Sequence, residues 1–202
     1  MPLLLRTRVV AFWILSLAVA LASWRWAVFG VAASMEVMLY HALARPVAFY
    51  AHVGFAPVAL ALLPLQFWTR LRVRRPGLHR WLGRLYGLSI LLSGLGGLVL
   101  ALTTEAGPAA AWGFGLLAVI WLAVTARAVQ LAMARRIAEH RRWMIRSAAL
   151  TFGAVTLRLE LPVLVVLFGF DTGYQVVSWL AWVPNLLVAE WLLWRPRPAV
   201  AA

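Results

Sequence analysis

Six long runs of apolar residues, separated by short polar segments, make up most of the chain. A helix needs about 20 apolar residues to cross the hydrocarbon core of a bilayer, and the six runs are of about that length. The predicted spans are 9–24, 47–68, 82–102, 111–131, 144–170 and 174–194. We therefore predict an all-α, polytopic membrane helix bundle with six transmembrane helices, forming a single transmembrane domain over 1–202.

The first run is the weakest of the six. Arg6 and Arg8 precede it, and Ala20-Leu21-Ala22 near its end resembles a signal-peptidase cleavage site. We expect an uncleaved anchor. Cleavage is the alternative, and it would leave five spans with the same orientation.

Composition excludes a soluble or disordered protein. Of the 202 residues, 64% are hydrophobic and 12% are charged, whereas soluble domains are about 45–50% apolar. The net charge is +13, but the arginines cluster in short loops, which is typical of membrane orientation and not of a nucleic-acid partner. The absence of cysteine excludes disulfides and thiolate metal sites.

Arginine positions predict the orientation. With six spans, sixteen arginines fall on one side of the membrane, and only Arg25 and Arg45 fall on the other. Because positive residues are retained in the cytoplasm, we predict that both termini are cytoplasmic in a multi-pass protein of the bacterial cytoplasmic (inner) membrane. The sequence predicts no oligomeric state. The sixteen are Arg6, Arg8, Arg70, Arg72, Arg74, Arg75, Arg80, Arg84, Arg127, Arg135, Arg136, Arg141, Arg142, Arg146, Arg195 and Arg197.

Three predicted helices carry a face of histidine with small or polar residues. Successive residues of a helix are 100° apart, which places the members of each set on one face. We expect such faces to point at protein, a cavity or a cofactor, because lipid offers no hydrogen bonds to polar groups. The three faces are His52, Ala56, Ala59, Leu63 and Gln66; His79, Gly83, Tyr86, Ser93 and Gly97; and His140, Ser147, Thr151 and Arg158.

One interpretation of these histidines is a heme b site. His79 and His140 lie at the same predicted depth, and two neutral imidazoles are suitable axial ligands of heme iron. Arg142 and Arg146 are candidate partners for the propionates, and His52 is left for a second site. The alternative is that His79 and His140 are interfacial and contact lipid phosphate or loop carbonyls.

A second group of polar residues lies deeper in the predicted spans. Arg158 sits near the middle of the fifth span, where insertion of an arginine costs about 2.5–3.5 kcal/mol, so we expect it to face the bundle. Asn185 and Glu190 of the sixth span are its candidate partners. This group is either a proton, quinone or anion site or a structural pair that fixes helix packing.

Several motifs from Pro46 through Glu190 resemble a family of bacterial predicted membrane proteins, domain of unknown function 2306 (DUF2306). The most specific is His140-Arg-Arg-Trp-Met-Ile-Arg-Ser147. The others are His52-Val-Gly54, Leu65-Gln-Phe67, His79-Arg80 with Gly83-Arg84 and Tyr86, Ala149-Leu-Thr151, Thr156-Leu-Arg158, and Trp182-Val-Pro-Asn-Leu186 with Glu190. The resemblance implies a polytopic membrane protein and marks as family-pattern residues His52, His79, His140, Arg146, Arg158, Asn185 and Glu190.

The chain is similar, more loosely, to the six-helix transmembrane diheme cytochromes b. Those proteins hold one heme between helices two and four and another between helices three and five. Here the third and fifth predicted helices carry His79 and His140, but the fourth carries no histidine. The likeness therefore implies at most a one-heme version, or a non-histidine ligand at the other site.

Two functional hypotheses follow. The first is an integral membrane protein that binds heme b through His79 and His140 for electron transfer, with a quinone or another redox protein as partner. The second is a cofactor-free transporter or membrane-complex subunit with a polar site at Arg158, Asn185 and Glu190. No catalytic residue is identified, and no motif decides whether the protein is an enzyme.

Overall fold

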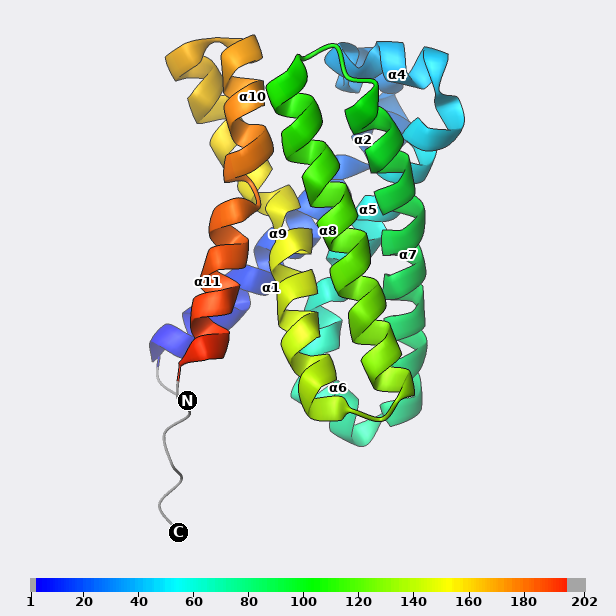
Figure 1. Ribbon diagram of the computed structural model, residues 1–202, viewed down its shortest axis with the longest axis vertical. Coiled ribbons are helices and arrows are strands. Elements are labelled where there is room, and N and C mark those ends of the chain that lie inside the picture. The colour runs from blue at the N-terminus through cyan, green and yellow to red at the C-terminus, as the bar shows by residue number, and fades with distance from the viewer. Residues whose placement is uncertain (1–2, 196–202) are drawn as a thin grey trace.

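The computed structural model describes residues 3–195, and all regular secondary structure in that range is helical (Figure 1). Arg197 and the side chain of Arg6 lie outside the described part. The helices are α1 (Leu3–Ser23), α2 (Arg25–Phe29), α3 (Val31–Ser34), η1 (Glu36–Met38), α4 (Leu39–Ala44), α5 (Pro46–Phe67), α6 (Thr69–Arg74), α7 (Pro76–Leu102), α8 (Pro108–Met133), α9 (Ile137–Phe168), α10 (Phe170–Leu180) and α11 (Val183–Trp194).

The prediction of six membrane spans is confirmed. Six helical segments of the described chain are long and apolar enough to cross a bilayer, so the protein is a multi-pass membrane protein. Three of the helices begin well before the predicted apolar runs, α1 at Leu3, α7 at Pro76 and α9 at Ile137. Hydrophobicity marks the part of a helix inside lipid, whereas a helix start is marked by features such as the proline at the first position of α7.

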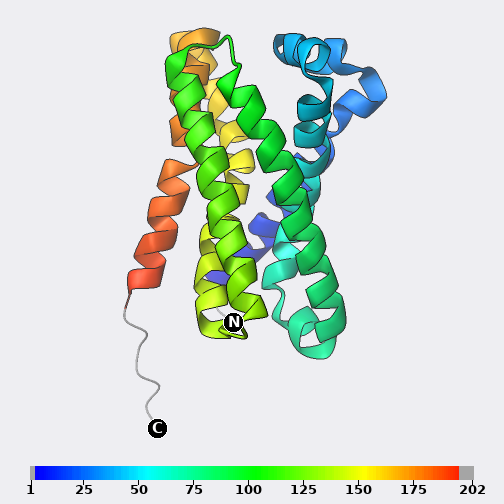
Figure 2. The same ribbon diagram turned by 45° about the vertical axis from the view of Figure 1, so that its right-hand side comes forward.

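Four helices form a ring around the main core. α7 packs between α5 and α8, and α9 packs against α8 and α5, so α7 and α9 face each other across the ring (Figures 1 and 2). Helix α1 crosses this ring diagonally and packs mainly on α5, while α10 and α11 pack on α9. The interior of the ring is where side chains from helices distant in sequence can meet.

The sixth span, predicted over 174–194 with a kink at Pro184, is broken near its middle. α10 ends at Leu180 and α11 begins at Val183, with Pro184 in the first turn of α11. The backbone carbonyls released by the break find side-chain donors: Trp182 Nε1 donates to Ser178 O at 2.8 Å and Asn185 Nδ2 donates to Ala181 O at 3.1 Å. A break inside a bilayer is tolerated only when such partners exist.

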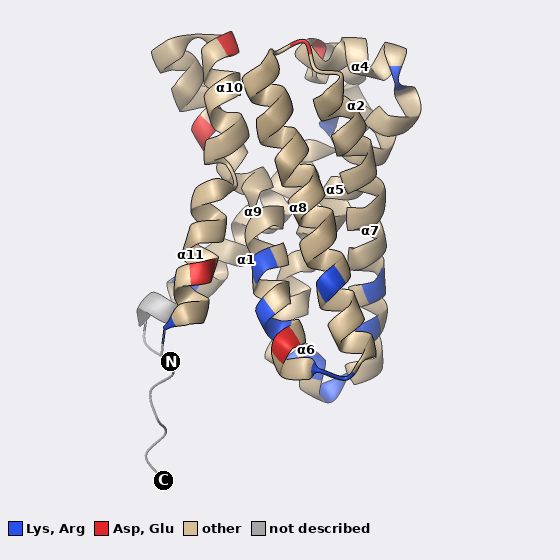
Figure 3. Cartoon of the chain, viewed as in Figure 1, with Lys and Arg blue, Asp and Glu red and all other residues tan. Residues whose placement is uncertain are grey.

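The arginines are unevenly distributed along the bundle axis. Most arginines gather around α6, the starts of α7 and α9 and the end of α8, which we call the arginine-rich end (Figure 3). The opposite end carries the short helices α2, α3, η1 and α4. This asymmetry supports the predicted orientation, and which end faces the cytoplasm stays a prediction.

Helices α5 and α7 approach closely at one glycine. A Cβ placed on Gly96 of α7 lies 2.5 Å from the carbonyl oxygen of Ala48 and 3.0 Å from the amide nitrogen of His52, both backbone atoms of α5. Backbone atoms cannot rotate away as a flexible side chain can. The contact between α5 and α7 therefore requires glycine at position 96.

We predict that Gly96→Ala destabilises the protein by about 1–3 kcal/mol through overpacking. Gly87→Ala is the matched control on the same helix, because its added Cβ meets only Val129 Cγ2 at 3.7 Å. Thermal unfolding in detergent, followed by tryptophan fluorescence, measures both. Equal unfolding temperatures for the two variants would contradict the close approach.

His41 is the buried histidine of the short helices at the opposite end. It is 1% exposed, and its Nδ1 has no hydrogen-bond partner among the described residues. Burial, and next the positive charge of Arg45, lower the pKa of His41 below its ordinary value. The folded protein therefore keeps this imidazole neutral at a pH where the unfolded chain is already protonated.

We predict that His41 makes stability fall as the pH drops below about 6.5, the ordinary histidine value. Above that pH its contribution is complete, and it is lost as the pH falls toward the lowered value of the folded state. Unfolding temperatures of wild type and His41→Gln, compared between pH 7.5 and pH 5, isolate the effect. Parallel pH profiles for the two proteins would contradict it.

Candidate functional site

A layer of hydroxyl groups connects three helices inside the ring. Tyr86 of α7 is 1% exposed, and its hydroxyl lies 2.9 Å from Ser147 Oγ and 2.8 Å from Thr151 Oγ1, both on α9. Two side chains of α8 complete the layer: Thr125 Oγ1 lies 2.8 Å from Ser147 Oγ, and Trp121 Nε1 donates to Thr151 Oγ1 at 2.9 Å. We call these five residues the hydroxyl layer.

The hydrogens of this layer follow one direction. Thr151 donates its single hydroxyl hydrogen to the carbonyl oxygen of Ser147, at 2.8 Å. In the bond between Tyr86 and Thr151, Tyr86 must therefore be the donor. Ser147 must then donate to Tyr86, and Thr125 to Ser147, because each hydroxyl has one hydrogen. Every donor is used once, and a chain of bonds with a common direction strengthens itself in a low-dielectric interior.

The predicted polar faces are confirmed at this layer for Tyr86, Ser147 and Thr151, which all point into the ring. Trp121 and Thr125 were not predicted. The sequence around them carries no histidine, so α8 lacked the residue that singled out the other helices. Their signal was a hydroxyl one turn from an indole in a run that is otherwise almost wholly apolar.

A second polar layer lies two turns nearer the arginine-rich end. His79 precedes Tyr86 by seven residues on α7, and His140 precedes Ser147 by seven residues on α9, a rise of about 10 Å on each helix. The two imidazoles are near enough to interact electrostatically. The structure thus brings His79 and His140 to one end of the ring, on the two helices that face each other across it.

Each of these histidines has a distinct hydrogen-bond state. His140 Nδ1 lies 2.8 Å from the carbonyl oxygen of Ala128 on α8. A carbonyl only accepts, so Nδ1 carries the hydrogen and Nε2 keeps its lone pair. His79 Nδ1 is buried without a partner among the described residues. Unpaired buried nitrogens are costly and call for an explanation.

Gln66 of α5 lies beside Gly83, which is one turn from His79 on α7. Its Nε2 is also buried and unpartnered within the described chain, and its Oε1 lies 3.3 Å from where a Cβ would stand on Gly83. We call Gln66, His79, Gly83 and His140 the histidine layer. It combines two imidazoles, an amide with an unpaired nitrogen, and a glycine against which that amide packs.

The described residues contain no group of three or more histidine, cysteine or acidic side chains placed to hold a metal ion. The histidine layer therefore offers two imidazoles and no further ligand of those types. A pair of imidazoles suffices where a macrocycle supplies the remaining ligands, as in heme iron. The two grooves described below lie on the outside of the ring, and neither is lined by His79 or His140.

His52 occupies a separate place in the other half of the ring. Its Nδ1 lies 2.9 Å from the carbonyl oxygen of Ser93, so it too donates from Nδ1. Its ring packs against Gly97, where a Cβ would lie 2.7 Å from Nδ1. His52 therefore does not join the histidine layer.

Arg146 forms an ion pair that fastens α11 to α9. Its Nε lies 2.5 Å from Glu190 Oε1 and its Nη2 lies 2.8 Å from Oε2, and the guanidinium stacks 5.0 Å from the centre of the Trp143 ring. Arg142, one turn earlier on α9, is exposed and makes no hydrogen bond within the described chain. Of the two predicted propionate partners, Arg142 is thus the one without a hydrogen-bonded carboxylate among the described residues, although its charge also acts on Glu190.

The structure does not bring Arg158 into contact with Asn185 or Glu190. Asn185 Nδ2 donates to Thr156 Oγ1 at 2.8 Å, whereas Arg158 is exposed and donates to the carbonyl of Ala154 on its own helix at 2.9 Å. Arg158 was expected to face the bundle, whereas its side chain is exposed in the structure. Beyond Thr151, α9 packs against the α10–α11 segment, and Thr156, not Arg158, points toward it.

We predict that Tyr86→Phe costs about 1–3 kcal/mol of stability, because the Ser147 hydroxyl loses its acceptor and Thr151 loses a donor. Tyr50→Phe is the matched control, since Tyr50 is 43% exposed. Thermal unfolding of both variants in detergent tests the prediction. If Tyr86→Phe unfolds at the temperature of the control, the hydroxyl layer does not hold the ring together.

The comparisons with known proteins agree with the fold. The model of the family described as "Predicted membrane protein (DUF2306)" matches residues 49–193, which include the ring, the hydroxyl layer and the histidine layer. No curated protein and no solved structure matches the chain. Since the family model covers well over half of the chain, this integral membrane protein belongs to the DUF2306 family.

Proposed function

We propose that this protein binds heme b at the histidine layer, with His79 and His140 as axial ligands, and transfers electrons in the bacterial cytoplasmic membrane. The observation that supports the proposal is that these two imidazoles lie at one end of the ring, within electrostatic reach of each other and on helices that face each other. A bound heme supplies one-electron redox chemistry at that place.

His140 is prepared for this role by its neighbour. Ligating histidines usually donate their other ring hydrogen to a carbonyl or carboxylate, which fixes the tautomer and the ring orientation. His140 makes such a bond to the carbonyl of Ala128. Its Nε2 lone pair is therefore the one available to a metal.

His79 and Gln66 supply the groups that still lack partners. His79 Nδ1 and Gln66 Nε2 are both buried without a hydrogen bond in the described chain. A heme bound at this layer would give each of them a partner. The His79 imidazole would coordinate its iron, and the Gln66 amide would donate a hydrogen bond. Gly83 allows the Gln66 amide to lie close to α7 beside this layer.

The surroundings of the layer have supporting roles. The hydroxyl layer lies between the histidine layer and the middle of the membrane-spanning helices. Its groups are hydrogen-bonded to one another, so it separates the site from the other half of the ring. Arg142, which has no hydrogen-bonded carboxylate among the described residues, is the proposed contact for a propionate. Arg146 is held by Glu190 and instead positions α11.

For the electron partner we propose a membrane quinone or another redox protein. The support is the position of the layer, inside membrane-spanning helices and close to their arginine-rich end. His52 is the remaining membrane histidine with an ordered Nδ1–H and a free Nε2, and we propose it for a second site.

A second candidate function is a cofactor-free transporter or subunit of a membrane complex. The Arg146–Glu190 pair and the bond of Asn185 to Thr156 favour it, because they tie α11 to α9, while the bond of Asn185 to Ala181 spans the break itself. Broken helices are recurrent at transport sites. In this case the polar groups serve movement or docking of α11.

An absorption spectrum of the detergent-purified protein, from cells supplied with heme, separates the two. We expect a Soret band that shifts on reduction with dithionite, and about one heme per chain in a pyridine hemochrome assay. His79→Ala and His140→Ala are each expected to lose it, because a bis-histidine site needs both ligands. The matched control is His41→Ala, which removes a histidine at the opposite end.

Retention of heme by His41→Ala with loss in the other two supports the proposal. A wild-type spectrum that contains only tryptophan absorption would overturn it and favour the second candidate. So would a heme content that is the same in all three variants.

A further inference from the structure

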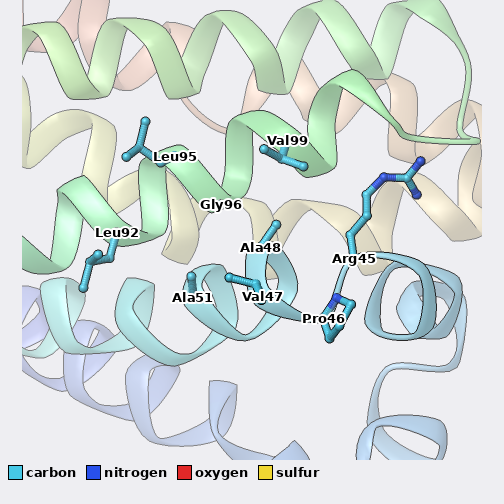
Figure 4. A pocket seen from close by; sticks show the side chains of 9 residues that line it. All are labelled: Arg45, Pro46, Val47, Ala48, Ala51, Leu92, Leu95, Gly96 and Val99. Atoms are coloured by element: carbon cyan, nitrogen blue, oxygen red, sulfur yellow. The ribbon is translucent and has the colours of Figure 1, made fainter.

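An apolar groove runs along the outside of the ring between α5 and α7. Its volume is about 470 Å³, and its lining is apolar apart from one arginine at one end (Figure 4). Leu92 and Ala51 line the end nearer the middle of the helices, and Val99 and Arg45 lie at the other end. The lining residues are Arg45, Pro46, Val47, Ala48, Ala51, Leu92, Leu95, Gly96 and Val99.

The groove opens outward and follows the helices. Val47 is 85% exposed, and Leu95 and Val99 are 50% and 42% exposed, so its walls face the lipid around the protein. From Leu92 to Val99 the groove follows α7 for about 10 Å, at 1.5 Å per residue. This shape suits a lipid acyl chain lying against the protein with its headgroup at the Arg45 end.

Arg45 is unpaired among the residues that the structure describes. It makes no side-chain hydrogen bond or ion pair within the described chain, whereas Arg25, the other arginine of this end, donates to the carbonyl of Ser34 from Nε and Nη2. In Figure 4 the Arg45 side chain extends from the start of α5 toward the end of α7. A half-buried guanidinium at the mouth of an apolar groove calls for an anion.

The start of α5 adds to this positive potential. Arg45 directly precedes Pro46, and no side chain caps the first turn of α5. The free amide groups of a helix start carry partial positive charge and favour anions. The groove therefore has apolar walls and a positively charged end. These match the acyl chain and the phosphate of a phospholipid.

We propose that this groove binds one anionic phospholipid of the surrounding leaflet, with its phosphate on Arg45 and an acyl chain between Ala51 and Leu92. Arg binds phosphate through two parallel hydrogen bonds. Burial of the chain contributes little net free energy, since the bilayer is equally apolar. Selection thus comes from Arg45, and an added choline cation on the headgroup weakens it. This site is independent of the proposed heme.

Photo-crosslinking in lipid vesicles tests the site directly. The full-length protein is reconstituted in phosphatidylcholine containing a small fraction of phosphatidylglycerol with a diazirine on its acyl chain. Labelled peptides are mapped, and label on 46–51 and 92–99 is compared with the same diazirine chain on phosphatidylcholine. We expect the phosphatidylglycerol probe to be enriched at these segments.

Two variants separate the headgroup from the channel. Arg45→Gln removes the phosphate contact, and we expect the enrichment to fall at least about tenfold, the equivalent of one charge-assisted hydrogen bond. Ala51→Phe fills the channel and leaves Arg45 in place, so it should also abolish the enrichment. Arg25→Gln is the matched control and should keep it.

An internal standard comes from the second groove, between α7 and α8, which Arg84 lines near the arginine-rich end. Label there should be unchanged by Arg45→Gln, which shows that the variant is folded and inserted. Equal labelling by both headgroups overturns the proposal. So does enrichment that survives either Arg45→Gln or Ala51→Phe.

Discussion

The hydroxyl of Tyr86 is the group on which the arrangement of the ring depends. A phenol buried in a membrane protein must be paired internally, because there is no water in the hydrocarbon to bond it. Its two partners, Ser147 and Thr151, lie on the facing helix, and Thr125 and Trp121 of α8 complete their bonding. Three helices are thereby held at one spacing and one rotation.

That spacing carries over to the histidines. His79 and His140 stand two helical turns from Tyr86 and Ser147, on the same faces. Once the hydroxyl layer sets the rotation of α7 and α9, both imidazoles must be directed toward the ring near the arginine-rich end. The paired layer bounds the site, and the unpaired nitrogens of His79 and Gln66 lie beyond it. The chain thus combines a hydroxyl layer in which every group is hydrogen-bonded with a histidine layer in which two buried nitrogens lack partners.

Much of this helix arrangement could be predicted from the sequence. Apolar runs set the six spans, and the spacing of His79 with Tyr86 and of His140 with Ser147 and Thr151 predicted which faces turn inward. Thr125 and Trp121 were missed because hydroxyls and indoles are common in apolar helices, and only their contacts distinguish them. The break after Leu180 depends on carbonyl partners such as the Trp182 indole, which no local pattern specifies.

Pairings between helices were the least predictable part. Arg146 and Glu190 lie 44 residues apart, and their contact depends on how α11 leans on α9. Arg158 was expected inside the ring by helical periodicity, but its side chain is exposed and bonds to a carbonyl of its own helix. Periodicity gives the direction of a side chain relative to its own helix, whereas the neighbour on that side is decided by the tertiary packing.

The most direct test of the account is an experimental structure of the protein isolated from heme-supplied cells. The account predicts density for a planar macrocycle at the arginine-rich end of the ring, with ring nitrogens of His79 and His140 on its two faces and the Tyr86 layer intact behind it. A structure in which these imidazoles contact only protein carbonyls or lipid headgroups would contradict it.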